Sequence, residues 1–173
     1  AAEACRQGTV RTLGSDTVVA QCSAPGAAAF VTALCEPGSA DRAGRDTQTT
    51  PCGEPEAGNW VTATCRAGAL DTLGSDTVTA GCRAPGEGQY VGAICIAGSS
   101  AELGHDIVAM GCAAPEEGHY TIAVCVAGDW GTAGANTATE ACGEADAGEY
   151  LISACVAGSA VQRGRDTEIM PCT

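Results

Sequence analysis

The sequence predicts an all-β, small disulfide-rich fold: an elongated array of about six 30-residue repeats with short β-strands, turns and almost no helix. The cysteine spacing comes first, because gaps of 17 and 13 residues alternate from Cys5 to Cys172 without an insertion. Strand chemistry comes second: residues 76–79 and 90–95 lie between glycines and prolines, and no segment has a capped helical period. Composition comes third, because two Trp, three Tyr and one Phe beside 24 Gly cannot fill one large core.

The repeats superimpose without gaps when they are counted from each odd-numbered cysteine. Their consensus is C-x-A-G-S-x4-G-x-D-T-x4-C-x-x-P-x-x-G-x-Y-V-x-A-x. Residues 1–173 are therefore expected to form one tandem array, with units at 5–34, 35–64, 65–94, 95–124, 125–154 and a partial unit at 155–173. If each unit is a hairpin of roughly 8 residues per arm, it spans about 25 Å, and six units end to end form a rod on the order of 150 Å.

Twelve cysteines at fixed spacing indicate disulfides and therefore an extracellular or cell-surface location. Structural zinc is not expected, because no CxxC pair occurs and the two histidines are not repeated. The chain has no signal peptide and no initiator Met, so we expect a processed form or a segment of a longer protein. A net charge of −13 disfavours a nucleic-acid partner, and no apolar run is long enough to span a membrane.

Two glycine columns and one acidic column recur in every repeat. Fixed glycines, such as Gly68 and Gly74, suggest positive φ or close backbone approach. The acidic column keeps a side-chain oxygen even where Asn replaces Asp, which favours capping of a turn. Calcium ligation is the alternative, although one Asp per unit is too few for a cage around the ion. The predicted turn-capping residues are Asp16, Asp46, Asp76, Asp106, Asn136 and Asp166.

An aromatic column follows a column of prolines, which are Pro25, Pro55, Pro85 and Pro115 with Ala145 in the fifth unit. These aromatics are the large apolar anchors of their units, so we expect them to form a small core or the stacking contact between units. An exposed ladder that binds carbohydrate is the alternative. Trp130 lies outside the column, in a variable loop, and is expected to be exposed. The predicted stacking aromatics are Phe30, Trp60, Tyr90, Tyr120 and Tyr150.

The segment C-x-x-P-x-x-G-x-Y-V-x-x-x-C-x-x-G-S-x4-G-x-D-T-x4-C resembles the cysteine-rich modules of the tumour necrosis factor receptor family. In that family, C-x-x-C-x-x-G-x-Y leads to a further cysteine and then to G-x-D-T-x-C-x-x-C. Here Pro55 and Thr79 stand where two of the family's cysteines would lie, so both partners of one disulfide are missing together. This reduced, two-cysteine form is similar to surface proteins of microbes and unicellular algae.

The resemblance implies disulfides between cysteines thirteen residues apart. It leaves Cys5 and Cys172 over, for links to further repeats or to the next subunit. The rival pairing runs from Cys5–Cys22 to Cys155–Cys172 and leaves no cysteine unpaired. Loop closure does not choose between them, because either loop is worth about 3 kcal/mol. The implied pairs are Cys22–Cys35, Cys52–Cys65, Cys82–Cys95, Cys112–Cys125 and Cys142–Cys155.

Catalysis and cofactor binding are not expected, because no histidine column is present to act as a base and no lysine follows the glycines. The favoured hypothesis is an extracellular structural protein that associates head to tail into a rod or filament. The alternatives are a receptor or adhesin ectodomain that binds a protein or a glycan, and a lattice binder of calcium or of ice through a threonine column. The Thr residues are candidates for O-glycosylation, for example Thr47, Thr49 and Thr50.

Overall fold

The computed structural model describes all 173 residues, and its regular elements are ten short β-strands with no helix. This confirms the predicted all-β, disulfide-rich repeat array. The strands are β1 (Ala29–Ala33), β2 (Gln48–Pro51), β3 (Asn59–Ala63), β4 (Val78–Gly81), β5 (Gln89–Ala93), β6 (Val108–Gly111), β7 (His119–Ala123), β8 (Ala138–Ala141), β9 (Glu149–Ser153) and β10 (Glu168–Pro171).

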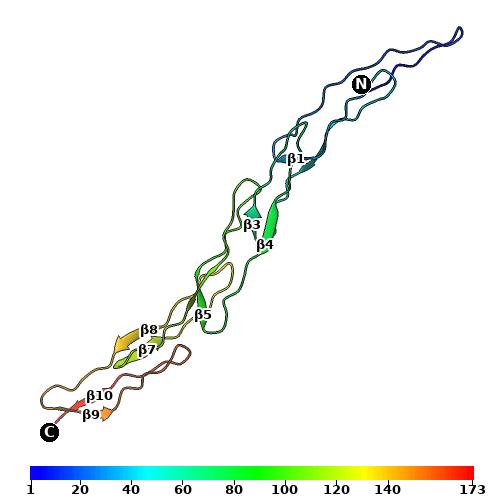
Figure 1. Cartoon of the computed structure of the whole chain (residues 1–173). Helices are drawn as coiled ribbons and strands as arrows, with labels where there is room; N and C mark the ends of the chain where they lie inside the picture. The colour runs from blue at the N-terminus through cyan, green and yellow to red at the C-terminus, as the bar shows by residue number, and fades with distance from the viewer. The chain divides into compact units, whose positions relative to one another are not determined.

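The strands pair only with their chain neighbours, in five two-stranded sheets: β1–β2, β3–β4, β5–β6, β7–β8 and β9–β10. The pairs β1–β2, β5–β6, β7–β8 and β9–β10 are antiparallel. Figure 1 shows β9 beside β10 near the C-terminus. Isolated bridges carry each ladder beyond its strands, for example Glu36↔Arg45. Each repeat is thus one long β-hairpin, with a base where the strands pair and a tip at the turn. The hairpins, numbered one to six in chain order, comprise residues 1–22, 28–52, 58–82, 88–112, 118–142 and 148–172.

A bulge interrupts the ladder at the same place in successive hairpins. In the second hairpin, Val31 faces Thr49, but Ala33 faces Gln48, so one extra residue lies on the first strand. The same shift occurs in the fourth, fifth and sixth hairpins. The first hairpin has no strand pair and is closed only by the bridges Glu3↔Val18, Arg6↔Ser15 and Thr9↔Thr12.

The hairpins straddle the boundaries of the units counted from the cysteines. The second hairpin, for example, begins seven residues before Cys35 and ends at Cys52. The chain divides into two compact units, of which the first comprises residues 1–80 and 97–104 and the second comprises residues 81–96 and 105–173. No helix in the structure has the length and apolar character needed to cross a membrane.

Neither compact unit encloses a large core. The fully buried side chains are Val31, Val61, Val91 and Thr121, which occupy one repeat column immediately after the aromatics. Because each hairpin buries so little by itself, its stability must come from cross-links and from its neighbours along the chain.

Candidate functional site: the joint between consecutive hairpins

The joint between two consecutive hairpins is built on the backbone of one buried residue. Val31, in the base of the second hairpin, donates its N–H to the carbonyl of Ala67 near the tip of the third, at 2.8 Å. The carbonyl of Val31 accepts from the N–H of Gly74 on the returning arm of that tip, at 2.9 Å. Val61, Val91 and Thr121 repeat both bonds with the hairpins that follow them, at 2.8–2.9 Å. The base of one hairpin therefore holds the tip of the next.

Strand geometry explains why this residue is free to bond outward. Alternate residues of an antiparallel ladder point their N–H and C=O groups away from their partner strand. Val31 is such a residue, and the bulge that follows it ends the regular ladder. Each of the three valine joints combines burial of one aliphatic side chain, worth about 1.5–3 kcal/mol, with two backbone hydrogen bonds of about 0.5–1.5 kcal/mol each.

Both glycine columns are required where the tip enters the joint. Gly68 adopts a φ of 77°, in the left-handed region that disfavours residues with a Cβ. Gly74 lies so close to its surroundings that an added Cβ would stand 2.6 Å from the Ala67 carbonyl oxygen and 2.8 Å from the Phe30 Cβ. The two explanations offered by the sequence, positive φ and close approach, therefore both apply.

A disulfide crosses each joint. It links the cysteine that ends one hairpin to the cysteine in the first arm of the next, with Cα atoms 5.9–6.0 Å apart. These bonds join cysteines thirteen residues apart, as the family resemblance implies, and the rival pairs are absent. The pairs are Cys22–Cys35, Cys52–Cys65, Cys82–Cys95, Cys112–Cys125 and Cys142–Cys155.

The acidic column caps its own turn and also reaches back to the preceding hairpin. Oδ1 of Asp76 accepts the N–H of Thr77 at 2.7 Å and the N–H of Gly53, 23 residues earlier, at 2.8 Å. Asp46, Asp106 and Asp166 accept the same two kinds of N–H. Asn136 does so without a charge, from Ala113 at 2.9 Å and Thr137 at 2.8 Å. Asp16 accepts only from Thr17.

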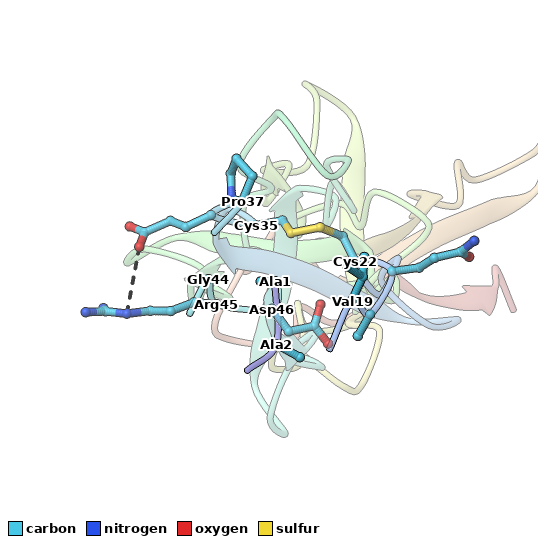
Figure 2. Close-up of a pocket in the computed structure, with 12 residues that line it drawn as sticks. Ala1, Ala2, Val19, Cys22, Cys35, Pro37, Gly44, Arg45 and Asp46 are labelled. Carbon is cyan, nitrogen blue, oxygen red and sulfur yellow. Dashed lines mark ion pairs between the residues drawn. A yellow bond between two sulfur atoms is a disulfide. The ribbon is translucent and has the colours of Figure 1, made fainter. Parts of the chain in front are cut away.

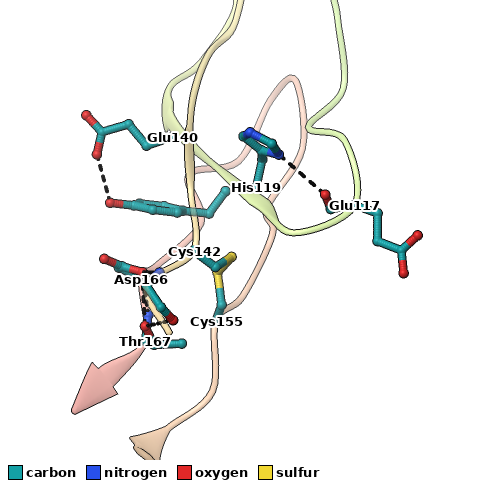
Figure 3. The surroundings of a disulfide bond; sticks show 9 residues. Glu117, His119, Glu140, Cys142, Cys155, Asp166 and Thr167 are labelled. Atoms are coloured by element: carbon teal, nitrogen blue, oxygen red, sulfur yellow. Dashed lines mark hydrogen bonds between the residues drawn. A yellow bond between two sulfur atoms is a disulfide. The ribbon is translucent and has the colours of Figure 1, made fainter. Parts of the chain in front are cut away.

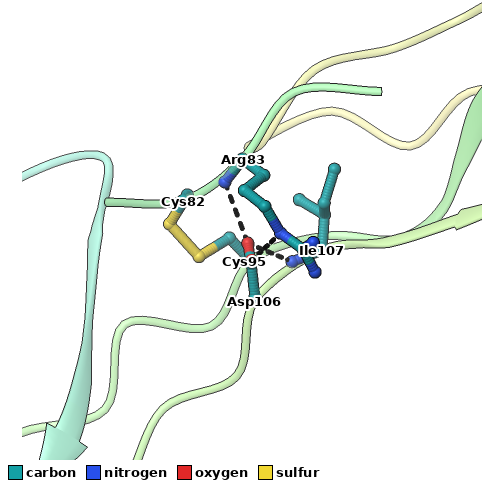
Figure 4. A network of polar contacts seen from close by, with 5 residues as sticks. All are labelled: Cys82, Arg83, Cys95, Asp106 and Ile107. Atoms are coloured by element: carbon teal, nitrogen blue, oxygen red, sulfur yellow. Dashed lines mark hydrogen bonds and ion pairs between the residues drawn. A yellow bond between two sulfur atoms is a disulfide. The ribbon is translucent and has the colours of Figure 1, made fainter. Parts of the chain in front are cut away.

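The joint that contains Asp106 adds an ion pair. The Arg83 backbone N–H donates to Oδ1 of Asp106 at 2.9 Å, and Arg83 Nε donates to Oδ2 at 2.5 Å (Figure 4). The backbone hydrogen bond from Arg83 is the largest cause of the lowered pKa of the Asp106 carboxyl. Hydrogen bonds from the backbone N–H groups of Ser23 and Gly143 likewise lower the pKa of Asp46 and Asp166 below 3.8. The ionised form of each carboxylate is therefore the one that the joint stabilises.

The aromatic column flanks the joint and is less buried than the valine column. Phe30, Trp60, Tyr90 and Tyr120 are half-buried. Tyr120 donates its hydroxyl to Glu140 at 3.0 Å, which raises the pKa of the phenol (Figure 3). Tyr150, in the sixth hairpin, is 48% exposed.

The residue after the aromatic is the one that sequence reasoning passed over. It is aliphatic or β-branched in every repeat, and this was the available signal. The positions that follow the even cysteines, such as Gly53, were also missed, because their role is carried by a backbone N–H and leaves no mark in the sequence.

The remaining candidate groups do not converge on a second site. Sulfurs of Cys22 and Cys35 lie near a carboxylate oxygen of Asp46, but the sulfurs are joined in a disulfide and are not thiolate ligands for a metal. An open hollow beside this disulfide is lined by small residues such as Ala1 and Gly44 together with larger polar ones such as Gln21 (Figure 2). Arg45 and Glu36, which form an ion pair at 3.7 Å, also line this hollow.

The threonine column points inward. The hydroxyl oxygens of Thr47, Thr77 and Thr137 are buried, which is unsuited to binding an external lattice such as ice. Thr49 and Thr50, the other O-glycosylation candidates, are exposed on β2. Trp130 lies near the tip of the fifth hairpin and is 44% exposed.

Cys5 and Cys172 are free and exposed. They lie in the first and sixth hairpins, the two hairpins that have a neighbour on one side only. No family model, curated protein or solved structure matches the chain.

Proposed function

We propose that the chain is a non-catalytic structural protein of an extracellular rod or filament, in which hairpins add one after another through identical joints. The observation that carries the proposal is the recurrence of one joint at Val31, Val61, Val91 and Thr121, with the same two backbone hydrogen bonds at each. Disulfides across the joints support an oxidising, extracellular setting.

The offset within a joint supports an extended array. Val61 of the third hairpin is the residue equivalent to Val31 of the second. Val31 bonds instead to Ala67, six residues further along the third hairpin. At about 3.3 Å per residue, this offset advances each hairpin by about 20 Å. If all six hairpins are joined with this offset, we expect an array on the order of 150 Å long.

Small-angle X-ray scattering of the 173-residue chain tests this function. A rod of about 150 Å has a radius of gyration of about 43 Å, whereas a compact domain of this length has about 16 Å. We expect a value near the first figure and a cross-section of hairpin width. A radius of gyration near the second figure would overturn the structural role.

A receptor or adhesin ectodomain is the second candidate, and Trp130 favours it. The exposed indole sits in the fifth repeat, which also departs from the consensus at Asn136 and Ala145. The resemblance to tumour necrosis factor receptor modules belongs to this candidate. Binding to a glycan array or to source-cell surfaces that Trp130→Ala abolishes, and Val161→Ala leaves intact, would favour a receptor. Equal binding by both variants would remove the argument from Trp130.

A further inference from the structure

The base of the sixth hairpin has the surface of a joint but holds no tip. Leu151, the counterpart of the fully buried Val31, is 49% exposed. Neither the N–H nor the C=O of Leu151 makes the bonds that Val31 makes with the following hairpin. Tyr150 is likewise the most exposed member of its column. The base of the sixth hairpin therefore has the residues of an internal joint, but no following tip covers them.

The tip of the first hairpin lacks the other partner, because no preceding base holds it. Leu13 is 100% exposed, whereas its counterparts Leu73 and Leu103, whose tips are held by a preceding base, are 53% and 58% exposed. The N–H of Gly14 makes no bond equivalent to that of Gly74 with Val31. Asp16 accepts one N–H, whereas its counterparts in the later repeats accept two.

The vacant groups at the two ends complement each other. If residue n of a second copy takes the place of residue n + 180, six repeats of 30 residues further on, every internal contact has a counterpart. Leu151 then bonds to Gln7 and Gly14 of the second copy, and the N–H of Thr173 meets Asp16 of the second copy. Cys172 faces Cys5 of the second copy, because 13 residues separate them in this numbering, as in every observed disulfide.

Charge favours the same contact. The first hairpin carries Arg6 and Arg11 along its tip. Glu149 lies in the base of the sixth hairpin, and the segment just before that hairpin carries Glu144. At an internal joint, the equivalent Glu54 accepts the N–H of Ser100 in the following tip, at 3.1 Å. Opposite charges across the contact offset part of the repulsion between two chains of net charge −13.

We propose that the base of the sixth hairpin binds the tip of the first hairpin of a second copy of this chain, and that Cys172 and Cys5 then form an intermolecular disulfide. This inference rests on the proposed structural role and names its partner and register. It commits to a second copy because the contact continues an interface that the chain already forms four times within itself.

Formation of the bond needs an oxidant, and a small-molecule disulfide such as oxidised glutathione supplies it. The Cys172 thiolate attacks this disulfide, forms a mixed disulfide and releases one small thiolate. Cys5 of the second copy then attacks the Cys172 sulfur and releases the second small thiolate. The protein loses two protons and two electrons, and the small disulfide becomes two thiols.

Single-cysteine variants test the register. Cys5→Ser retains only the free thiol of Cys172, and Cys172→Ser retains only that of Cys5. In a glutathione redox buffer, we expect an isotopically labelled mixture of the two variants to form heterodimers at least ten times faster than either variant forms homodimers. Peptide mapping should find Cys172 joined to Cys5. Homodimers that form as fast as heterodimers would overturn the proposal.

Surface variants show whether the joint contacts direct the cross-link. Leu13→Asp or Leu151→Asp, each added to the single-cysteine variant that supplies its end, should slow heterodimer formation at least tenfold. Both side chains are exposed in the chain, so folding should not change. Val161→Asp, on another exposed apolar residue, is the matched control and should leave the rate unchanged. Equal rates for all three would refute docking at this surface.

The scattering measurement separates the two proposals. An extended chain that forms no preferred heterodimer would retain the structural role and reject the head-to-tail contact. A compact chain would reject the structural role, whichever cross-links formed.

Discussion

Replacing Thr121 by Val should strengthen the joint between the fifth and sixth hairpins. Thr121 is fully buried, and its hydroxyl oxygen has no hydrogen-bond partner, whereas the equivalent residues of three earlier joints are valines. A buried, unpartnered hydroxyl costs about 1–3 kcal/mol, and Val has nearly the same shape as Thr. We therefore expect Thr121→Val to raise the free energy of opening this joint by about 1–2 kcal/mol.

Native-state hydrogen exchange measures this gain locally. The Gly164 amide donates to the Thr121 carbonyl and is released when the joint opens. A gain of about 1–2 kcal/mol slows its exchange roughly 5- to 30-fold. Amides of the first compact unit provide an internal reference, because the change should not reach them.

The reciprocal variant is the control. Val91→Thr places the same hydroxyl at a joint that now has none, so the Gly134 amide, which donates to the Val91 carbonyl, should exchange faster by a similar factor. If Thr121→Val left Gly164 unchanged, or Val91→Thr slowed Gly134, the unpartnered hydroxyl would not be the source of the cost.

Two further results are expected. Ala28 has a φ of 54° in a column that is otherwise filled by glycines. Ala28→Gly should therefore raise the free energy of unfolding by up to about 1 kcal/mol, measured as a higher denaturant midpoint. An unchanged or lower midpoint would count against strain at Ala28. The lowered pKa of Asp106 means that its contribution is present above the unfolded value, near pH 4, and is lost as the pH falls through the folded value. Below about pH 4, the exchange rate of the Arg83 amide, corrected for its intrinsic rate, should therefore rise. The corrected rate of the Ala113 amide should not rise, because Ala113 donates to the uncharged Asn136. Equal rises in the two rates would contradict this reasoning.

Local chemistry made the class of fold predictable from sequence. The alternating cysteine gaps and the fixed glycines required a repeating, cross-linked unit, and the exchange of Asp for Asn pointed to a side-chain oxygen that caps a turn. The glycines and the turn-capping oxygens act within a few positions of themselves, and the cysteine pairs are only thirteen residues apart.

Contacts between repeats could not be predicted in the same way. The aromatic column was expected to form a small core or the stacking contact between units. The fully buried side chains belong to the next column, whose outward-facing backbone groups hold the next tip. The hydrogen bond from the Gly53 N–H to Asp76 depends on the offset between consecutive hairpins. A consensus obtained by superimposing the repeats contains no information on this offset.

The disulfides determine which parts of the chain can carry tension. A pull on the two ends passes through Cys22–Cys35 and bypasses the segment between them, so that segment cannot be drawn out while the bond is intact. Fully extended at about 3.5 Å per residue, each bypassed segment would add about 40 Å of contour length. Five such segments hold about 200 Å in total, so reduction would lengthen the part of the chain that a load can draw out by about that amount.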